Sequence, residues 1–193
     1  VLENSAKINF SKDDMFINFE TIAYEDLSKQ ESDRYEYIFP KIELSKNLNN
    51  KTKLNGDFVF NSQILNQNYN TNVLETININ DLKFFSFAKI TEGGIYNNYE
   101  FIIKNSNTNA KNSISYKNNE SSNVSGLLQF NSSLPLSKSN KNYTKLLNPK
   151  LALKIAPNYT KDYRNNNNEI DINNIYSLER NAEIDSVEGG ISL

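Results

Sequence analysis

The chain has 193 residues, a hydrophobic fraction of 37 % and a net charge of −2. Its apolar content is low for a conventional two-layer core. Its net charge does not indicate the basic surface that binds nucleic acid. Because Cys and His are both absent, a disulfide framework, a Ser-His-Asp hydrolase and a Cys/His zinc site are excluded. No apolar run of about 18 residues is present, which excludes a transmembrane helix.

Two further features of the composition bear on order. The 22 Phe and Tyr residues argue against intrinsic disorder, because disordered segments are poor in aromatic side chains. Asparagine occurs 35 times, which we interpret as the codon bias of an AT-rich genome. An aggregation-prone Asn-rich segment is the alternative. The Asn residues, however, interrupt an apolar alternation and form no long tracts.

Alternating polar and apolar residues predict extended strands in the first half of the chain. The predicted strands span 6–10, 15–24, 35–46, 57–65, 69–79 and 83–91, with polar connections at 25–34, 48–52 and 66–68. The expected apolar faces comprise Met15, Ile17, Phe19, Thr21 and Ala23, and then Ile38, Pro40, Ile42 and Leu44; a polar set suited to a watery lumen comprises Asn70, Asn72, Thr76 and Asn78. Pro40 is expected to interrupt the pairing of its strand, since it cannot donate to a ladder.

The second half of the chain continues the same pattern. A turn is expected at Gly93-Gly94, followed by strands at 95–105 and 111–118 with a polar loop at 107–109 between them. Strands are also predicted at 124–136 and 147–157, separated by a basic loop at 137–142. The segment 165–168 is expected to be a loop, 170–177 a short strand or turn, and a last strand begins at 184.

The segment 147–157 shows the alternation most clearly. Leu147, Leu151, Leu153 and Ile155 fall on one side, and Asn148, Lys150, Ala152 and Lys154 fall on the other. A lipid-facing strand needs about 9–11 residues of this kind, and a Lys at the lipid midplane would cost ~2–4 kcal/mol, so the lysines are expected to face the lumen. We therefore predict an all-β chain, an antiparallel up-and-down meander of about ten strands, with residues 1–193 forming part of the wall of a transmembrane β-barrel.

No constellation in the sequence predicts a catalytic, cofactor-binding or metal-binding residue. The carboxylate pairs Asp13-Asp14, Glu25-Asp26 and Asp185–Glu188 are interpreted as solvated turns or lumen charges. Glu169, Asp171 and Asn174 resemble ligands of a hard cation, but the spacing of an EF-hand and its central Gly are missing. Gly93-Gly94 and Gly189-Gly190 lack the pattern of a phosphate-binding loop.

A loose basic cluster lies beside the end of a predicted strand. It consists of Lys138, Lys141 and Lys145. These side chains could contact lipopolysaccharide phosphates or anionic headgroups. The alternative is a loop that the charges merely keep soluble.

Several short motifs resemble the barrel domain of the LptD family, the lipopolysaccharide-assembly outer-membrane proteins, also called organic solvent tolerance proteins. They are Leu134-Pro135-Leu136, Leu147-Asn148-Pro149-Lys150 and Ile155-Ala156-Pro157, followed by 170–177, Glu179-Arg180-Asn181 and 185–190. Upstream, the stretch 33–40, Asp-Arg-Tyr-Glu-Tyr-Ile-Phe-Pro, is similar to another strand of the same barrel. The resemblance spans most of the chain.

The resemblance implies a function that alternation cannot show. Such proteins insert lipopolysaccharide into the outer leaflet of the outer membrane through a lateral opening, with an LptE-type plug lipoprotein in the lumen. It implies that this chain is a fragment containing central wall strands, with the periplasmic domain that meets the Lpt bridge proteins outside it. Outer-membrane lipid is a further expected partner, nucleic acid is not, and no catalytic or substrate-binding residue is carried over. Alone, the fragment is expected not to form a stable barrel, because its terminal strands would have unpaired edges.

Two other functions remain open on the sequence. A general porin or receptor barrel would favour clustered Arg and acidic residues, but the three Arg residues, Arg34, Arg164 and Arg180, are scattered along the chain. A β-rich surface adhesin would favour a fixed repeat period, and we find none. An enzyme is the least favoured class.

Overall fold

The computed structural model describes residues 1–30, 33–157, 170–180 and 185–193. Within these ranges the chain forms strands and turns but no helix, so there is none that could cross a membrane. The strands are β1 (Leu2–Lys12), β2 (Met15–Glu25), β3 (Tyr35–Leu48), β4 (Gly56–Tyr69), β5 (Val73–Ser86), β6 (Lys89–Ile90), β7 (Tyr96–Lys111), β8 (Ser121–Ser133), β9 (Leu136–Ser139), β10 (Thr144–Leu147), β11 (Lys150–Ala156) and β12 (Gly190–Ser192).

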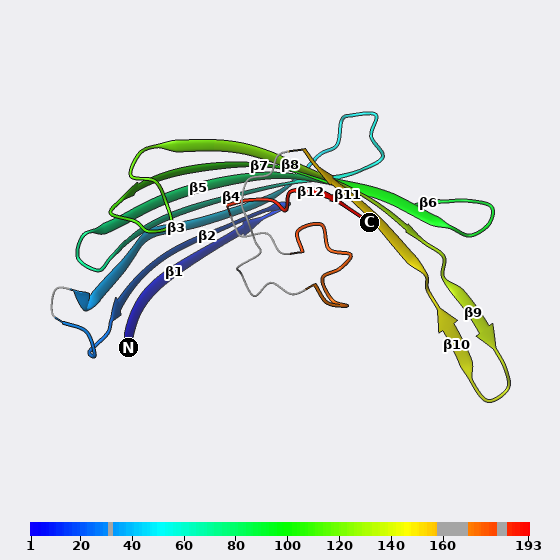
Figure 1. Ribbon diagram of the computed structural model, residues 1–193, viewed down its shortest axis with the longest axis horizontal. Coiled ribbons are helices and arrows are strands. Elements are labelled where there is room, and N and C mark those ends of the chain that lie inside the picture. The colour runs from blue at the N-terminus through cyan, green and yellow to red at the C-terminus, as the bar shows by residue number, and fades with distance from the viewer. Residues whose placement is uncertain (31–32, 158–169, 181–184) are drawn as a thin grey trace. The chain divides into compact units, whose positions relative to one another are not determined.

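The strands form an antiparallel meander, which confirms the predicted all-β class (Figure 1). The main sheet has the order β1-β2-β3-β4-β5-β7-β8-β11-β12; β6 pairs with β7, and β9 pairs with β10 in a separate two-stranded sheet. In the described part of the chain, β1 and β12 are the two edges of the main sheet and do not pair with each other. The sheet is therefore not closed into a barrel.

The chain divides into two compact units. The first comprises 1–48, 59–82 and 104–124, and the second comprises 49–58, 83–103 and 125–193. Each unit gathers segments that are far apart in the sequence, because successive antiparallel strands pass through both.

In the first unit, β2 pairs with β1 on one side and with β3 on the other. Phe19 lies opposite Ile8 and also opposite Ile42, so the predicted apolar face of β2 is confirmed and continues across three strands. The register of the β2–β3 pair shifts between Glu20 and Ile22, opposite the segment that contains Pro40. The predicted interruption is thus confirmed.

The shift also corrects one prediction of the sequence. Ile38 lies opposite Ile22, whereas Ile42 lies opposite Phe19. Ile22 and Phe19 point to opposite faces of β2, since side chains alternate along a strand. Ile38 therefore does not share a face with Ile42, because the extra residue in β3 reverses the alternation, as a β-bulge does.

The middle strands are longer than the sequence predicts. The segments 66–68 and 107–109 were expected to be polar connections, but they lie inside β4 and β7. Of the strand predicted at 111–118, only Lys111 is in a strand, as the last residue of β7, and 112–118 is a connection. Likewise, β5 continues to Ser86 without the break expected between 79 and 83. The reason is side-chain hydrogen bonding between neighbouring strands: Asn66 accepts from Thr76, and Asn107 accepts from Ser122.

In the second unit, β8 and β11 form a hairpin that continues into β9 and β10. Ser133 lies opposite Lys150 and Leu136 lies opposite Leu147, so one register runs through both pairs of strands. The break falls at Leu134-Pro135 and Asn148-Pro149. The predicted strands 124–136 and 147–157 therefore pair with each other, and the predicted loop 137–142 shrinks to a tight turn at 140–143.

The described C-terminal residues, 170–180 and 185–193, contain little regular structure. Residues 172–176 form turns, which is one of the two forms expected for 170–177, and β12 begins at Gly190. The predicted loop at 165–168 and the start of the last strand at 184 lie outside the described residues.

An aromatic cluster in the second unit makes Gly56 a sensitive position. Phe84 is fully buried and stacks on Phe101, with ring centroids 5.2 Å apart. A Cβ atom at Gly56 would collide with the carbonyl oxygen of Phe85 and lie 2.7 Å from Cζ of Phe84.

We expect Gly56→Ala to destabilise the fold by about 1–3 kcal/mol, the usual effect of overpacking. Chemical denaturation followed by circular dichroism measures the change. Gly93→Ala is the control, because the nearest atom to its added Cβ would be 3.9 Å away. Equal effects of the two substitutions would contradict close packing at Gly56.

Candidate functional site

The exposed face of β8 and β11 is apolar. Leu128 lies opposite Ile155 and Phe130 lies opposite Leu153, so these side chains stand on one face. Leu151 is 51 % exposed and Ile155 is 40 % exposed. Ile191 of β12 lies opposite Ile155 and extends the same face to a third strand. We call Leu128, Phe130, Leu151, Leu153, Ile155 and Ile191 the apolar stripe.

The other face of the same strands is buried and largely polar. Lys154 lies opposite Gln129, and their exposures are 2 % and 0 %. Ala152 and Ala156, which alternate with the stripe residues along β11, are also buried. The sequence prediction that Lys154 lies opposite to the leucines is therefore confirmed. Lys150 of the same face is exposed.

Two C-terminal segments, 170–180 and 185–189, cover this polar face. Leu178 and Val187 are buried in one cluster with Ile102, Leu127 and Ala156. These contacts bring apolar side chains onto the otherwise polar side. The covering segments thus bury the polar face and leave the apolar stripe exposed, the opposite of the usual arrangement for a half-buried antiparallel sheet.

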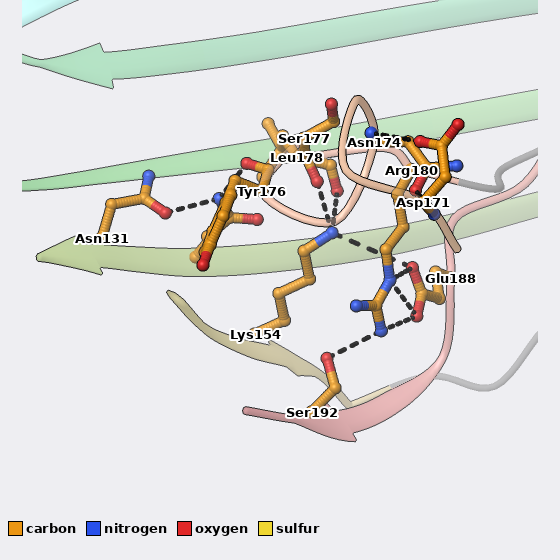
Figure 2. A network of polar contacts seen from close by, with 11 residues as sticks. Asn131, Lys154, Asp171, Asn174, Tyr176, Ser177, Leu178, Arg180, Glu188 and Ser192 are labelled. Carbon is orange, nitrogen blue, oxygen red and sulfur yellow. Dashed lines mark hydrogen bonds and ion pairs between the residues drawn. The ribbon is translucent and has the colours of Figure 1, made fainter. Parts of the chain in front are cut away.

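Lys154 is the centre of the polar contacts under this cover (Figure 2). Its Nζ donates to the carbonyl oxygens of Ser177 and Leu178, the latter at 3.3 Å. The Oε2 atom of Glu188 lies 3.9 Å from the same Nζ. A buried ammonium group needs such partners, because leaving it unpaired would cost several kcal/mol.

Arg180 and Glu188 join the two covering segments to each other. Nε of Arg180 donates to Oε2 of Glu188 at 2.8 Å, and Nη2 donates to Oε1 of the same carboxylate. Nη2 also donates to the Ser192 hydroxyl at 3.0 Å (Figure 2). A bidentate pair of this kind is geometrically specific. Glu188 thus links Arg180 to Lys154, and Arg180 extends the network to Ser192 of β12.

A second set of contacts attaches the turn at 172–176, and the residues after it, to the strands of the sheet. Nε2 of Gln129 donates to the carbonyl oxygen of Tyr176 at 2.9 Å and to Asn131 at 2.6 Å. Lys83 forms an ion pair with Glu179. The cover is therefore held by residues of β5, β8 and β11.

The first unit has a similar polar face. Lys41 lies between Glu20, at 3.4 Å, and Glu43, at 3.2 Å. Asn18 is buried and donates to Glu43 at 3.0 Å. On the opposite face of the same strands Ile8 is 67 % exposed. The sheet of the first unit therefore also has one polar face and one exposed apolar face.

The buried side of β5 and β7 is also polar in part. Lys104 and Asp81 form a buried ion pair with an N–O distance of 3.0 Å. Glu75 is buried and accepts hydrogen bonds from Tyr69, at 2.8 Å, and from Ser113. Burying such groups is costly unless each has a charged or hydrogen-bonding partner.

An amide ladder crosses β4, β5 and β7 in the first unit. Asn80 accepts from Ser62 at 2.8 Å and donates to Asn78 and Asn105. Beside the ladder lies an open pocket of about 330 Å³, lined by Thr76, Asn78, Asn107, Thr108, Asn109, Glu120, Ser121 and Ser122. The predicted polar face of Asn70, Asn72, Thr76 and Asn78 is wrong in part, because Asn70 and Asn72 lie in the turn between β4 and β5. Thr76 and Asn78 lie on β5, and Asn78 contributes to the ladder.

The structure gives Asp171 and Asn174 a local role. The backbone N–H groups of Asn173 and Asn174 donate to Asp171, which holds the pKa of this carboxyl below its ordinary value of 3.8. Asn174 in turn accepts from the backbone N–H of Asp171 at 2.8 Å. Their oxygens thus close a turn, and Glu169 lies outside the described residues. In the described ranges no group of three or more His, Cys, Asp or Glu side chains could hold a metal ion.

The residues of the other predicted acidic pairs have different environments in the structure. Asp13 adopts a left-handed backbone conformation in the β1–β2 turn. Asp26 accepts from the side chain and the backbone of Ser28, and both bonds lower the pKa of Asp26. Glu188 takes part in the covered network and is not a solvated charge. The sequence did not indicate its pairing with Arg180, which lies eight positions earlier in the chain.

Comparisons of the chain with protein-family models, with curated proteins and with solved structures find no match.

Proposed function

We propose that this chain forms part of the wall of an outer-membrane β-barrel that inserts lipopolysaccharide into the outer leaflet. The observation that carries the proposal is the arrangement of the sheet in the second unit. Its polar face is covered by other segments of the chain, and its apolar stripe is exposed. A membrane barrel needs an apolar band towards lipid and a polar interior. In water a contiguous apolar patch of this kind is a liability for aggregation.

The chemistry of the covered face supports the same proposal. Lys154 and Gln129 would face the lumen, and the segments 170–180 and 185–189 would fill part of it. Loops that occupy the interior are common in large barrels, whose interiors are polar. The ion-paired face of β1–β3, with Lys41 between two glutamates, fits a lumen in the same way.

The assignment to lipopolysaccharide rests on the resemblance of the sequence motifs to the LptD family. Two of these motifs, 134–136 and 147–150, pair with each other, and Arg180 and Glu188 of the later motifs form an ion pair. The proposed partners are lipopolysaccharide, outer-membrane lipid, an LptE-type plug lipoprotein in the lumen, and the periplasmic Lpt bridge proteins through domains outside this chain. The proposed location is the outer membrane.

A single-cysteine scan along β11 tests the membrane part of the proposal. Nitroxide labels at Leu151→Cys and Ile155→Cys are expected to be accessible to oxygen and shielded from a water-soluble relaxation agent once the chain is in vesicles. The label at Ala152→Cys, one residue from the first, is expected to show neither lipid exposure nor mobility, because Ala152 is buried beneath the covering segments. The natural absence of Cys makes each label unique.

Two outcomes of this scan would overturn the membrane assignment. Water exposure at Leu151 and Ile155 in the presence of vesicles would show that the stripe does not meet lipid. Lipid exposure at Ala152 would show that the wrong face is outward. The proposed contact with lipopolysaccharide is tested separately, by photo-crosslinking from the stripe in outer membranes. Crosslinks to phospholipid alone would contradict the assignment to lipopolysaccharide.

A further inference from the structure

The tip of the β9–β10 hairpin carries a concentrated positive charge. Lys138 lies directly opposite Lys145, and Lys141 lies in the connecting turn. Nζ of Lys145 lies over the ring of Tyr143, 5.3 Å from its centroid. All four side chains are exposed, and we call them the lysine tip.

Charge around the tip is one-sided. Residues 121–161 contain six Lys and no Asp or Glu, in a chain whose net charge is −2. Two like charges directly opposite each other on a hairpin repel. Among the described residues, no carboxylate forms an ion pair with Lys138, Lys141 or Lys145. Within the described ranges, no carboxylate paired with these lysines therefore offsets this repulsion.

The lysine tip is continuous with the apolar stripe. One register links Leu128–Ile155, Phe130–Leu153, Leu136–Leu147 and Lys138–Lys145, so the four pairs keep the same spacing along the hairpin on both sides of the break at 134–135 and 148–149. The last pair lies ten residues along the strand from the first, or about 33 Å at ~3.3 Å per residue. At a tilt of ~45° this length spans about 23 Å, close to the ~25 Å height of an apolar barrel band.

We propose that the lysine tip binds the phosphate groups of anionic phospholipids at the boundary of the bilayer that the apolar stripe enters. The inference rests on the proposed membrane location and adds a binding surface to it. Lys138 and Lys145 would contact headgroups where the aliphatic stripe ends, and the phenol ring of Tyr143 would lie at the same level. Aromatic and basic side chains are the usual anchors at this depth.

The choice of a phosphate-bearing headgroup follows from the chemistry of the tip. Ammonium groups on flexible stems bind phosphate as point charges and do not select planar carboxylates, as guanidinium groups do. Each Lys near an anionic membrane surface strengthens binding about fivefold. Three lysines together would give a preference for anionic over zwitterionic vesicles on the order of a hundredfold, and salt would weaken it.

The test compares three forms of the full chain: unmodified, Lys138→Gln/Lys141→Gln/Lys145→Gln, and a control with Lys29→Gln/Lys111→Gln/Lys117→Gln. The control lysines are exposed, lie outside the tip and change the net charge equally. Binding is measured by flotation with vesicles of phosphatidylcholine and with an equal mixture of phosphatidylcholine and phosphatidylglycerol. The tip variant is expected to lose most of the roughly hundredfold preference for the anionic mixture, and the control is expected to keep most of it.

Depth is read separately with single tryptophans, since the chain contains no Trp. Brominated lipids should quench Phe130→Trp strongly in all three forms, whereas Tyr143→Trp should be quenched by bromines near the headgroup. If Phe130→Trp is not quenched, the proposed function fails and the inference fails with it. If Phe130→Trp is quenched but the tip variant keeps its anionic preference, or the control loses as much, the inference alone is wrong.

Discussion

Replacing Lys154 with Met is expected to release the C-terminal segments from the polar face of the sheet. The substitution keeps a long side chain but leaves the carbonyl oxygens of Ser177 and Leu178 without their donor, and it removes one cation from Glu188. Breaking a buried ion pair by removing one partner typically costs about 3–5 kcal/mol. Hydrogen exchange of residues 170–180 and 185–193, followed by mass spectrometry, should show a loss of protection.

Lys150→Met is the matched control for this experiment. Lys150 lies on the same strand and the same face, but it is exposed and its ammonium group lies 5.5 Å from the ring centroid of Tyr176. Its loss should change protection little, as for an exposed cation–π contact worth about 0.5–1 kcal/mol. Similar exchange in the two variants would show that Lys154 does not hold the cover in place.

Placing Arg at Leu151 is expected to reduce insertion into vesicles sharply. Arg on the lipid face of a barrel costs about 2–4 kcal/mol near the bilayer midplane, which lowers the inserted fraction by a factor of roughly 30 to 1,000. In a protein whose stripe faces water, the same change at a half-exposed residue would stay within about 0.5 kcal/mol. Protection of β11 from protease in phosphatidylcholine vesicles measures the inserted fraction.

Leu54→Arg provides the comparison for this substitution. Leu54 is 41 % exposed and lies in the connection between β3 and β4, outside any strand. The same change in size and charge there should leave insertion nearly unchanged. Normal insertion of the Leu151 variant, or an equal loss in the Leu54 variant, would contradict a lipid-facing stripe.

The sequence was sufficient to predict which side chains share a face in β2 and β11, but it was not sufficient to predict where every strand ends. Period-two alternation predicted the two sides of β11 and β2, and Pro40 predicted the interruption in β3, because these depend on local backbone chemistry. The segments 66–68 and 107–109 were misassigned because Asn usually indicates a turn. Here their side chains bond across strands, and that pairing depends on neighbours 10 or more residues away.

The covered network depended still less on local pattern. Lys154 was expected to avoid the apolar side, but its burial depends on Ser177 and Leu178, which are 23 and 24 residues further along the chain. A charged residue in an alternating strand is compatible with an open aqueous lumen and with a covered one. No periodicity distinguishes these cases, since the covering segments have no regular structure of their own.

The paired breaks at Pro135 and Pro149 have a mechanical consequence. A hydrogen bond from the N–H of Leu134 to the carbonyl oxygen of Pro149 crosses the break, but Pro149 has no N–H to return it. The hairpin is therefore softer against bending there than on either side, while its register is preserved. A bend at this level would let β9 and β10 lie along a surface while β8 and β11 keep their positions.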